Sequence, residues 1–414
     1  MELQSILGIF TFIATAWLMS ENRRQVKVKT VAVGVVLQIA TGIILLKTPG
    51  ATAFFLMLNK GILAIEESTR AGTSLVFGYL GGGTNFPFKV TNPSANFLLA
   101  FQSLPLVLVM SALSALLFYW KILPAFVKGF SWLLKKTVGL GGAEGVGVSA
   151  NVFVGMVEAP LLVRPYLESM TRSEIFGIMT CGMATIAGTV MVLYASILGP
   201  VIPDVMGHIL IASIISVPAA ITIAKVMVPE TEQPTDGDVA LPRTAESSMD
   251  ALTTGTFQGI ELLINIVGML IVLVALVTLA NILLGFLPDM EGSPITLQRL
   301  MGLVMAPVTW LMGVPWDQAP TAGALMGTKT VLNEFLAYLD LGRLPAGSLS
   351  PKSMLIMTYA MCGFANPGSL GIMIGGLGTM APKRRAEIIS MGFRSIVSGT
   401  LATCMTGCVV GMLL

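Results

Sequence analysis

The sequence predicts an all-α protein that crosses a membrane several times. Hydrophobic residues make up 54% of the chain and charged residues 11%, whereas soluble proteins carry about 25% charged residues. The mean hydropathy is +0.84, and apolar stretches of roughly 20 residues, enough to cross a hydrocarbon core, recur along the chain. Such stretches must be helices, because lipid cannot satisfy backbone groups and the alternating pattern of membrane strands is missing.

Two spans are expected near the N-terminus, at residues 6–19 and 30–46. The segment between them, residues 20–29, carries four basic side chains. Short basic loops of membrane proteins lie in the cytoplasm, so this segment predicts an N-terminus on the external side.

Two amphipathic helices at the membrane surface are expected around a third span. Residues 49–70 alternate apolar and charged side chains, and residues 72–83 are typical of a glycine-rich loop. The third span is predicted at residues 96–121, running inward. The lysines that follow it predict the second amphipathic helix, on the cytoplasmic face (Lys121, Lys128, Lys135 and Lys136).

Residues 141–171 are too polar and too interrupted for a plain span, and two spans follow them, at residues 175–199 and 208–228. Residues 229–250, rich in Pro, Glu, Asp, Thr and Ser, predict a soluble linker that separates two halves of the chain.

The second half repeats this order. An amphipathic start leads into a long apolar helix at residues 261–286, then come an interrupted region, residues 295–341, and a span at residues 352–380. A basic turn precedes the final outward span (Lys383, Arg384 and Arg385). Together these features predict eight transmembrane helices and two re-entrant hairpins, with both termini outside.

The chain is thus expected to contain five parts. They are an N-terminal scaffold with interfacial helices, a first re-entrant hairpin with its following spans, the soluble linker, a long scaffold span, and a second re-entrant hairpin with the final two spans (residues 1–140, 141–228, 229–250, 251–294 and 295–414).

The two interrupted regions resemble each other. The first half contains NVFVGMVEAP at residues 151–160 and TCGMATIAG at residues 180–188. The second contains VLNEF at residues 331–335 and MCGFANPG at residues 361–368. With hairpins entering from opposite sides, this is an inverted repeat. In such folds substrate and ion sites lie near the bilayer midplane, where broken helices expose backbone groups.

A glutamate stands in each hairpin, Glu158 and Glu334. A charged side chain at the centre of a span costs about 2.5–3.5 kcal/mol on insertion scales, so such residues are usually functional. One structural alternative is an internal salt bridge, for example between Glu334 and Lys329. Another is a turn-forming role for residues 155–160 without ligand contact. The paired occurrence favours a ligand site.

Several other classes of function find little support. The formal net charge of +2 gives no reason to expect nucleic-acid binding. The interrupted regions show no Ser/His pair and no metal-binding cluster, so an intramembrane enzyme is disfavoured, and the four cysteines are interpreted as packing residues. A channel or a structural scaffold remains open, and a dependence of uptake on an ion gradient would exclude both.

These motifs resemble those of the concentrative nucleoside transporter family. The family's first-hairpin signature is matched at residues 151–161, and its Asn-Glu-Phe-x-Ala-Tyr element at residues 333–338. Its Cys-Gly-Phe-Ala-Asn element lies at residues 362–366, followed by Gly-x-x-Ile-Gly-Gly-Leu-Gly at residues 371–378. The resemblance covers nearly the whole chain. It implies a homotrimeric symporter in the cell inner membrane that imports nucleosides with a sodium gradient.

The same resemblance implies two sets of site residues. The nucleoside would be bound through its base near the first glutamate, through its ribose hydroxyls at Glu334, Asn366 and Ser369, and by packing (Gly155, Met156, Val157, Glu158, Val190, Glu334, Phe364, Asn366 and Ser369). Sodium would be held by two side chains and two backbone carbonyls at broken helix ends (Asn151, Thr185, Val154 and Ile186).

The chain departs from the family pattern at two places. Met156 and Val157 stand where the family usually has Gln followed by Thr or Ser, and Pro367-Gly368 also differs. We therefore expect an altered base preference. A proton is the alternative coupling ion, with Glu158 or Glu334 as the protonated group, although the retained Asn151 and Thr185 favour sodium.

Overall fold

The computed structural model describes residues 2–89, 98–235, 245–289, 292 and 294–414. Helices joined by turns make up this part of the chain, with no strand among the described residues. Six helical stretches in this part of the chain, some of them made of two consecutive helices, are long and apolar enough to cross a membrane. The predicted all-α membrane fold is thereby confirmed, while the count of eight spans stays a prediction.

The N-terminal third follows the predicted order, with one difference. α1 (Glu2–Leu18) and α2 (Val28–Lys47) lie where the first two spans are predicted, and α3 (Pro49–Phe77) follows. α3 continues into the stretch predicted to be a glycine-rich loop. It ends at Gly78, which has a φ of 59°, a left-handed conformation that glycine adopts without steric cost.

The third span forms as two pieces. A four-residue helix, α4 (Leu99–Gln102), precedes α5 (Leu106–Tyr119), and the first residues of the predicted span, 96 and 97, lie outside the described residues. Pro105, which has no N–H to donate, lies at the junction between the two helices. α6 (Ile122–Val138) follows where the second amphipathic helix is expected.

The same order of elements occurs twice in the rest of the chain. In each half a helix precedes two short hairpin helices, then two half-helices, then one long helix. The first set is α6, α7 (Gly142–Ala150), α8 (Glu158–Leu162), α9 (Arg172–Ala184), α10 (Gly188–Leu198) and α11 (Val205–Met227). The second set is α13 (Leu297–Leu311), α14 (Ala319–Val331), α15 (Glu334–Arg343), α16 (Pro351–Met361), α17 (Pro367–Met380) and α18 (Arg385–Leu413).

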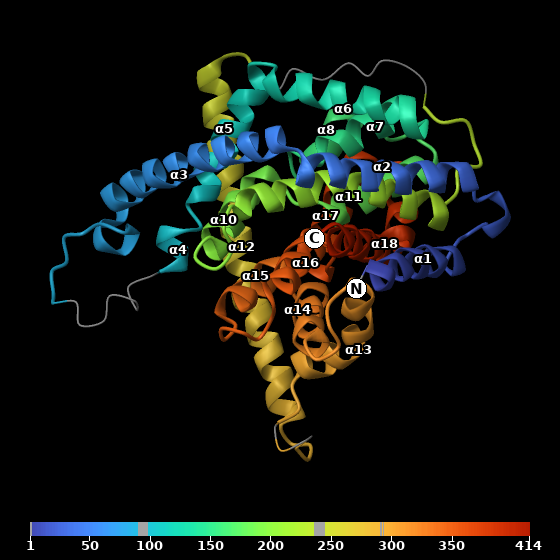
Figure 1. The fold of residues 1–414 in the computed structure, drawn as a ribbon. Coiled ribbons are helices and arrows are strands. Elements are labelled where there is room, and N and C mark those ends of the chain that lie inside the picture. Colours follow the sequence, from blue (N-terminus) through green and yellow to red (C-terminus); the bar gives the residue numbers. More distant parts are fainter. Residues whose placement is uncertain (1, 90–97, 236–244, 290–291, 293) are drawn as a thin grey trace.

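The contacts repeat with the order. α6 packs on α7 as α13 packs on α14, and α9 packs on α11 as α16 packs on α18. Figure 1 shows α6 and α7 at one end of the molecule and α13 and α14 at the opposite end, as an inverted repeat requires. The second hairpin proper is therefore α14 and α15, and α13 is the counterpart of α6.

Two predicted spans are broken in the middle. Residues 175–199 form α9 and α10, and residues 352–380 form α16 and α17. Pro367 explains the second break, since proline disfavours the helical conformation of the residue before it. At the first break the hairpin backbone comes close: a Cβ on Gly188 would lie 2.7 Å from the carbonyl oxygen of Phe153. The mean hydropathy of a segment reflects neither a proline nor a close approach of the backbone, so it predicts one continuous span in both places.

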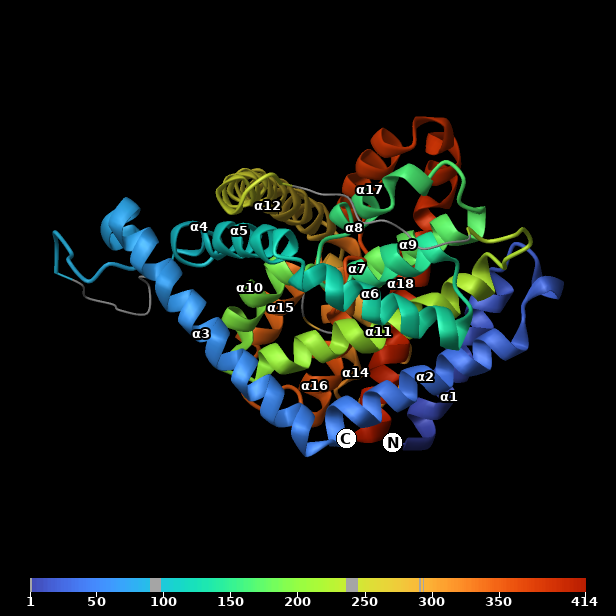
Figure 2. The same cartoon turned by 90° about the horizontal axis from the view of Figure 1, so that it is seen from above.

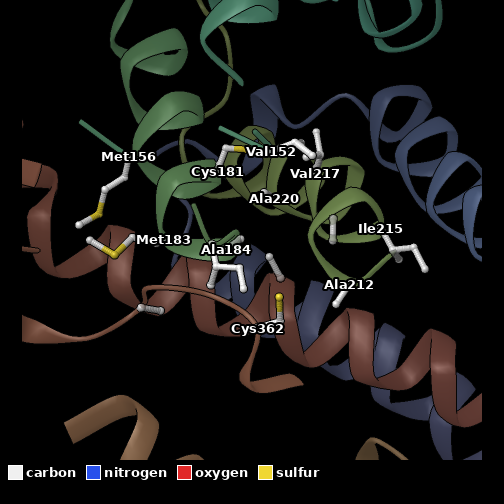
Figure 3. Packing of buried hydrophobic residues seen from close by; sticks show 14 of the residues in the cluster. Val152, Met156, Cys181, Met183, Ala184, Ala212, Ile215, Val217, Ala220 and Cys362 are labelled. Carbon is white, nitrogen blue, oxygen red and sulfur yellow. The ribbon is translucent and has the colours of Figure 1, made fainter. Parts of the chain in front are cut away.

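The two long helices α11 and α18 pack together at the centre of the fold. The hydroxyls of Ser216 on α11 and Thr406 on α18 are 2.9 Å apart. α9 packs on α18 as well, and there the hydroxyls of Thr180 and Ser398 are 2.8 Å apart. Buried apolar side chains surround these contacts. Figure 3 shows members of this cluster from both halves of the chain, Met156 and Cys181 from the first and Cys362 from the second.

The long helix α12 (Ser248–Leu284) is continuous and packs mainly on α5, at the edge of the bundle (Figure 2). Many of its large apolar side chains are exposed, for example Ile264, Ile271 and Leu279. Part of the predicted soluble linker, residues 236–244, lies outside the described residues.

Candidate functional site

A pocket that is open at its mouth lies where the two hairpin tips and the two helix breaks meet α12. All nine residues that the sequence indicates for substrate binding line it (Gly155, Met156, Val157, Glu158, Val190, Glu334, Phe364, Asn366 and Ser369). Sequence reasoning missed other lining residues, among them Tyr194, Asn333, Asn265 and Met269.

Glu334 is held by side chains from two other helices. The Tyr194 hydroxyl donates to its Oε1 at 2.7 Å, and the Asn366 side-chain amide donates to its Oε2 at 3.0 Å. Glu334 is the first residue of α15, where the helix dipole favours a negative charge. Each carboxylate oxygen keeps a lone pair for another donor. The carboxylate is thus fixed in place and still able to accept hydrogen bonds.

Asn366 has two roles at the second break. Its amide nitrogen binds Glu334, and its Oδ1 accepts the backbone N–H of Ser369 at 2.8 Å, which caps the start of α17. Gly368 has no Cβ, and a Cβ at this position would lie only 3.1 Å from Cε of Met269 on α12. Met269 of α12 also lines the pocket, so glycine at position 368 accommodates this side chain.

Tyr194 carries a signal that the sequence reasoning did not use. It lies four residues after Val190 on α10, so both side chains point to the same face of the helix. Once Val190 is expected at the pocket, helical spacing places Tyr194 there as well.

Glu158 is the first residue of α8, at the tip of the first hairpin. Its carboxylate folds over Gly155 so closely that a Cβ on Gly155 would collide with Oε2. The backbone amides of Val157 and Glu158 face the carboxylate. No salt bridge to Glu158 or to Glu334 occurs in the described ranges, so the salt bridge between Glu334 and Lys329 considered above is not formed.

The altered pair Met156 and Val157 packs against glycines of neighbouring helices. The Cβ of Met156 lies 3.0 Å from the position of a Cβ on Gly182, and Cγ1 of Val157 lies 2.9 Å from that of a Cβ on Gly376. Both residues also line the pocket. This part of the wall offers apolar surface and no side-chain hydrogen bond.

Two of the four predicted sodium ligands are in contact. Thr185 follows the last residue of α9, and its hydroxyl lies 3.3 Å from the backbone carbonyl oxygen of Asn151 and 2.9 Å from that of Cys181. Asn151 follows the last residue of α7, and its Nδ2 donates to the Gly147 carbonyl at 3.2 Å. The first hairpin and the first helix break meet here.

The oxygen atoms at this contact fit a hard monovalent cation. Asn151 is 1% exposed, and its Oδ1 has no hydrogen-bond partner among the described residues. A buried polar atom without a partner is costly, and a bound cation would remove that cost. Backbone carbonyls freed by broken helices are the usual Na⁺ ligands in such folds. The oxygens are neutral, as expected for sodium.

Val154 and Ile186 belong to the same two turns, and their carbonyl oxygens stay a prediction as ligands. The Ile186 N–H donates to the Ser213 hydroxyl of α11 at 3.3 Å. Ser213 was missed by the sequence reasoning, because a serine in an apolar helix carries no distinguishing signal.

Comparison with known proteins finds family models and relatives that together match nearly the whole chain. Three family models match. One is described as the Na⁺ dependent nucleoside transporter N-terminus, over residues 7–80, and one as the C-terminus of the same group, over residues 208–411. The third is described as nucleoside recognition, over residues 100–201.

Full-length relatives include the nucleoside permease NupC of Helicobacter pylori, which is 32% identical over 99% of this chain and 97% of its own length. The uncharacterized transporter YutK of Bacillus subtilis is 35% identical over 99% of both chains. Human solute carrier family 28 member 3 is 36% identical over 100% of this chain and 60% of its own length.

Solved structures agree with the fold. CNTnw in an inward-facing substrate-bound state has a TM-score of 0.91 and 33% identity, and the match covers 100% of this chain and 98% of that one. A variant of CNTnw in an outward-facing state has a TM-score of 0.90 and 32% identity, with 99% and 97% covered. These proteins are transporters and not enzymes. The chain therefore belongs to the concentrative nucleoside transporter family.

Proposed function

We propose that the protein is a sodium-coupled symporter that imports nucleosides by alternating access. The observation that carries the proposal is the geometry of Glu334. Its carboxylate is oriented by Tyr194 and Asn366 toward a pocket, and a buried amide oxygen of Asn151 without a partner lies at the neighbouring helix break.

The second hairpin would bind the ribose. Vicinal hydroxyls are donors, and a carboxylate that is already fixed by two hydrogen bonds accepts them with little loss of side-chain freedom. Ser369 lies beside Asn366 and supplies a further hydroxyl to the same wall. Val190 and Phe364 provide apolar surface for the rings of the ligand.

The first hairpin would read the base. Glu158 faces the pocket, and its carboxylate can accept a base N–H. Because Met156 and Val157 add apolar surface where the family usually has polar side chains, base selectivity would rest on Glu158 and on shape. The affinity of the pocket for the base would then depend on fewer hydrogen bonds than the usual family residues provide.

Sodium would couple to the substrate through the first hairpin. A cation between Asn151 and Thr185 ties the end of α7 to the break after α9, and Glu158 lies seven residues further along the same turn. Ordering this turn favours nucleoside binding. By linkage the nucleoside must then strengthen sodium binding by the same factor.

A second pocket adjoins the first and shares Gly155, Glu158, Thr189 and Leu262 with it. Polar side chains of α5 and α12 line it, including Ser111, Thr254 and Gln258. It opens a route between these helices and the first hairpin. The lysines of α6 at this end of the molecule indicate that the route leads to the cytoplasm.

The oligomer and the membrane are part of the proposal. The exposed apolar side of α12 suits a contact in a homotrimer, and the cell inner membrane suits a multi-pass importer with both termini outside. A proton-coupled transporter is the second candidate, with Glu158 or Glu334 carrying the proton.

Nucleoside binding to the purified protein tests the proposal. A panel of nucleosides is titrated in sodium and in potassium buffers at several pH values. We expect tight binding only with sodium, at a pH-independent sodium affinity. Binding that is equal in both salts and strengthens at low pH would favour the proton-coupled candidate, and no binding of any nucleoside would contradict the proposal.

A further inference from the structure

Lys329 is a fully buried basic side chain that the proposed mechanism does not use. It lies in the last turn of α14 and is 0% exposed. Its Nζ donates to the Thr403 hydroxyl of α18 at 3.0 Å. No salt bridge reaches it in the part of the chain that the structure describes, and Glu334 is the carboxylate whose charge acts on it. An ammonium buried in this way is costly and calls for a function.

Matching the two repeats helix by helix shows what Lys329 corresponds to in the first repeat, because α11 of the first repeat is the counterpart of α18 in the second. Ser216 of α11 and Thr406 of α18 touch each other, at 2.9 Å, where these two helices meet. One turn earlier on each helix stand Ser213 and Thr403. These two hydroxyls are therefore counterparts in the two repeats.

Each counterpart hydroxyl lies at the helix break of its own repeat. Ser213 accepts the N–H of Ile186 in the first break. Thr403 lies against the second break, since its Cγ2 is 2.9 Å from the position of a Cβ on Gly363. The end of a hairpin helix completes each arrangement: Asn151, just after α7, in the first repeat, and Lys329, near the end of α14, in the second.

We propose that Lys329 is a tethered cation that takes, in the second repeat, the place of the coupling sodium ion in the first. In the first repeat the hairpin presents an amide oxygen without a partner to the break. In the second it presents an ammonium to the corresponding hydroxyl. This inference rests on the proposed function, because it assigns the sodium site to the first repeat.

If Lys329 takes this place, Glu334 needs no bound ion and the number of sodium ions moved with each nucleoside is limited. The ammonium balances the carboxylate charge, so Glu334 stays available to accept ribose hydroxyls without an ion of its own. A covalently held cation is never released, so the second repeat adds nothing to coupling. One sodium ion, and one positive charge, should then move with each nucleoside.

The unchanged protein provides the first test. Reconstituted in proteoliposomes, it is held at a series of membrane potentials and sodium gradients, and the potential at which net nucleoside flux vanishes gives the charge moved. We expect one charge per uncharged nucleoside. Two charges would overturn the proposal, because a second cation would then bind elsewhere.

Lys329→Gln provides the second test, with Thr403→Val as the matched control that removes the hydrogen bond and keeps the charge. At saturating sodium we expect Lys329→Gln to weaken nucleoside binding at least tenfold. We also expect a steeper sodium dependence, with a Hill coefficient that rises from one toward two as the vacated place accepts an ion. Thr403→Val should keep a Hill coefficient of one.

Two outcomes would overturn the assignment. One is a Lys329→Gln protein with unchanged affinity; the other is weakened binding with an unchanged sodium dependence, which would make Lys329 a packing residue only. If Lys329→Gln does not fold, the charge measurement on the unchanged protein decides the question. An unchanged protein without any sodium-dependent nucleoside binding would overturn the proposed function and this inference together, whereas the outcomes above leave the proposed function standing.

Discussion

The side-chain amide of Asn366 donates a hydrogen bond of 3.0 Å to the carboxylate of Glu334, and this contact joins the break before α17 to the tip of the second hairpin. Asn366 also caps α17 through its other side-chain atom. One residue thus holds a helix start and a ligand-facing carboxylate in a fixed relation, as a preformed polar site requires.

Glu334→Gln should abolish nucleoside accumulation. The amide keeps the shape of the side chain but replaces one acceptor oxygen by a donor, which then faces the donors of Tyr194 and Asn366. Uptake into proteoliposomes measures the effect. Asp340→Asn is the matched control, since Asp340 lies on the same helix outside the pocket and should keep full uptake. Normal uptake by Glu334→Gln would remove the ribose assignment.

Tyr194→Phe should weaken nucleoside binding about tenfold while leaving the fold intact. The hydroxyl bonds a carboxylate at 2.7 Å, and hydrogen bonds to charged groups contribute about 1.5–3 kcal/mol, or roughly a factor of ten or more. Calorimetric titration gives the affinity. An affinity within twofold of the unchanged protein would show that Tyr194 does not position Glu334.

Asn151→Ala should weaken the dependence of nucleoside binding on sodium. The substitution removes the side-chain oxygen that has no partner among the described residues, and no protein hydrogen bond to that oxygen is lost. Ser149→Ala is the control: its hydroxyl is buried two residues earlier and bonds only the Gly145 carbonyl in the described part of the fold. An unchanged sodium requirement in Asn151→Ala would contradict the sodium site.

Restoring polar side chains with Met156→Gln and Val157→Thr should shift the preference among bases. Both positions line the pocket, and their present side chains offer no hydrogen bond to a base edge. Competition of a nucleoside panel against one labelled nucleoside measures the order of preference. An identical order in the double variant would mean that the base is read elsewhere.

Glu21→Gln should lower the thermal stability without changing nucleoside affinity. Glu21, in the turn after α1, pairs with Arg172 at 2.8 Å and with Arg394 at 2.7 Å. The hydrogen bond from Arg172 holds the pKa of the Glu21 carboxyl below its ordinary value. The stabilisation is therefore present above the ordinary carboxyl pKa of about 4.3 and is lost as the pH falls below it.

The melting temperatures of the unchanged protein and of Glu21→Gln should accordingly differ at pH 7 and converge on acidification. Glu168→Gln removes a more exposed pair with Lys383 and should have a smaller effect, since surface ion pairs contribute little. A difference between Glu21→Gln and the unchanged protein that persists in acid would exclude the ion pair as its cause.

Sequence patterns predict the all-α membrane fold and the order of its segments, but they miss the breaks within three predicted spans. Apolar runs predict most of the helices, the repeat points to the two glutamates, and the resemblance to the family's motifs implies the residues that the fold brings to one pocket. Glu158 and Glu334 lie 176 positions apart, and only the paired motifs connected them.

The sequence does not predict which residues of different helices contact each other. Residues 175–199 are apolar enough for one helix, yet α9 ends at Ala184 and α10 begins at Gly188, beside the Phe153 carbonyl of the hairpin. The bond from Lys329 to Thr403 joins residues 74 positions apart. The sequence does not predict this contact, because a lysine and a threonine are both common in helices and nothing in the pattern pairs them.

Uptake of a labelled nucleoside by proteoliposomes under an inward sodium gradient, with equal pH on both sides, tests the central claim most directly. The account predicts accumulation above the external concentration that collapses when the sodium gradient is dissipated and is much reduced in Asn151→Ala. Equilibration without accumulation, or accumulation that persists without sodium, would contradict it.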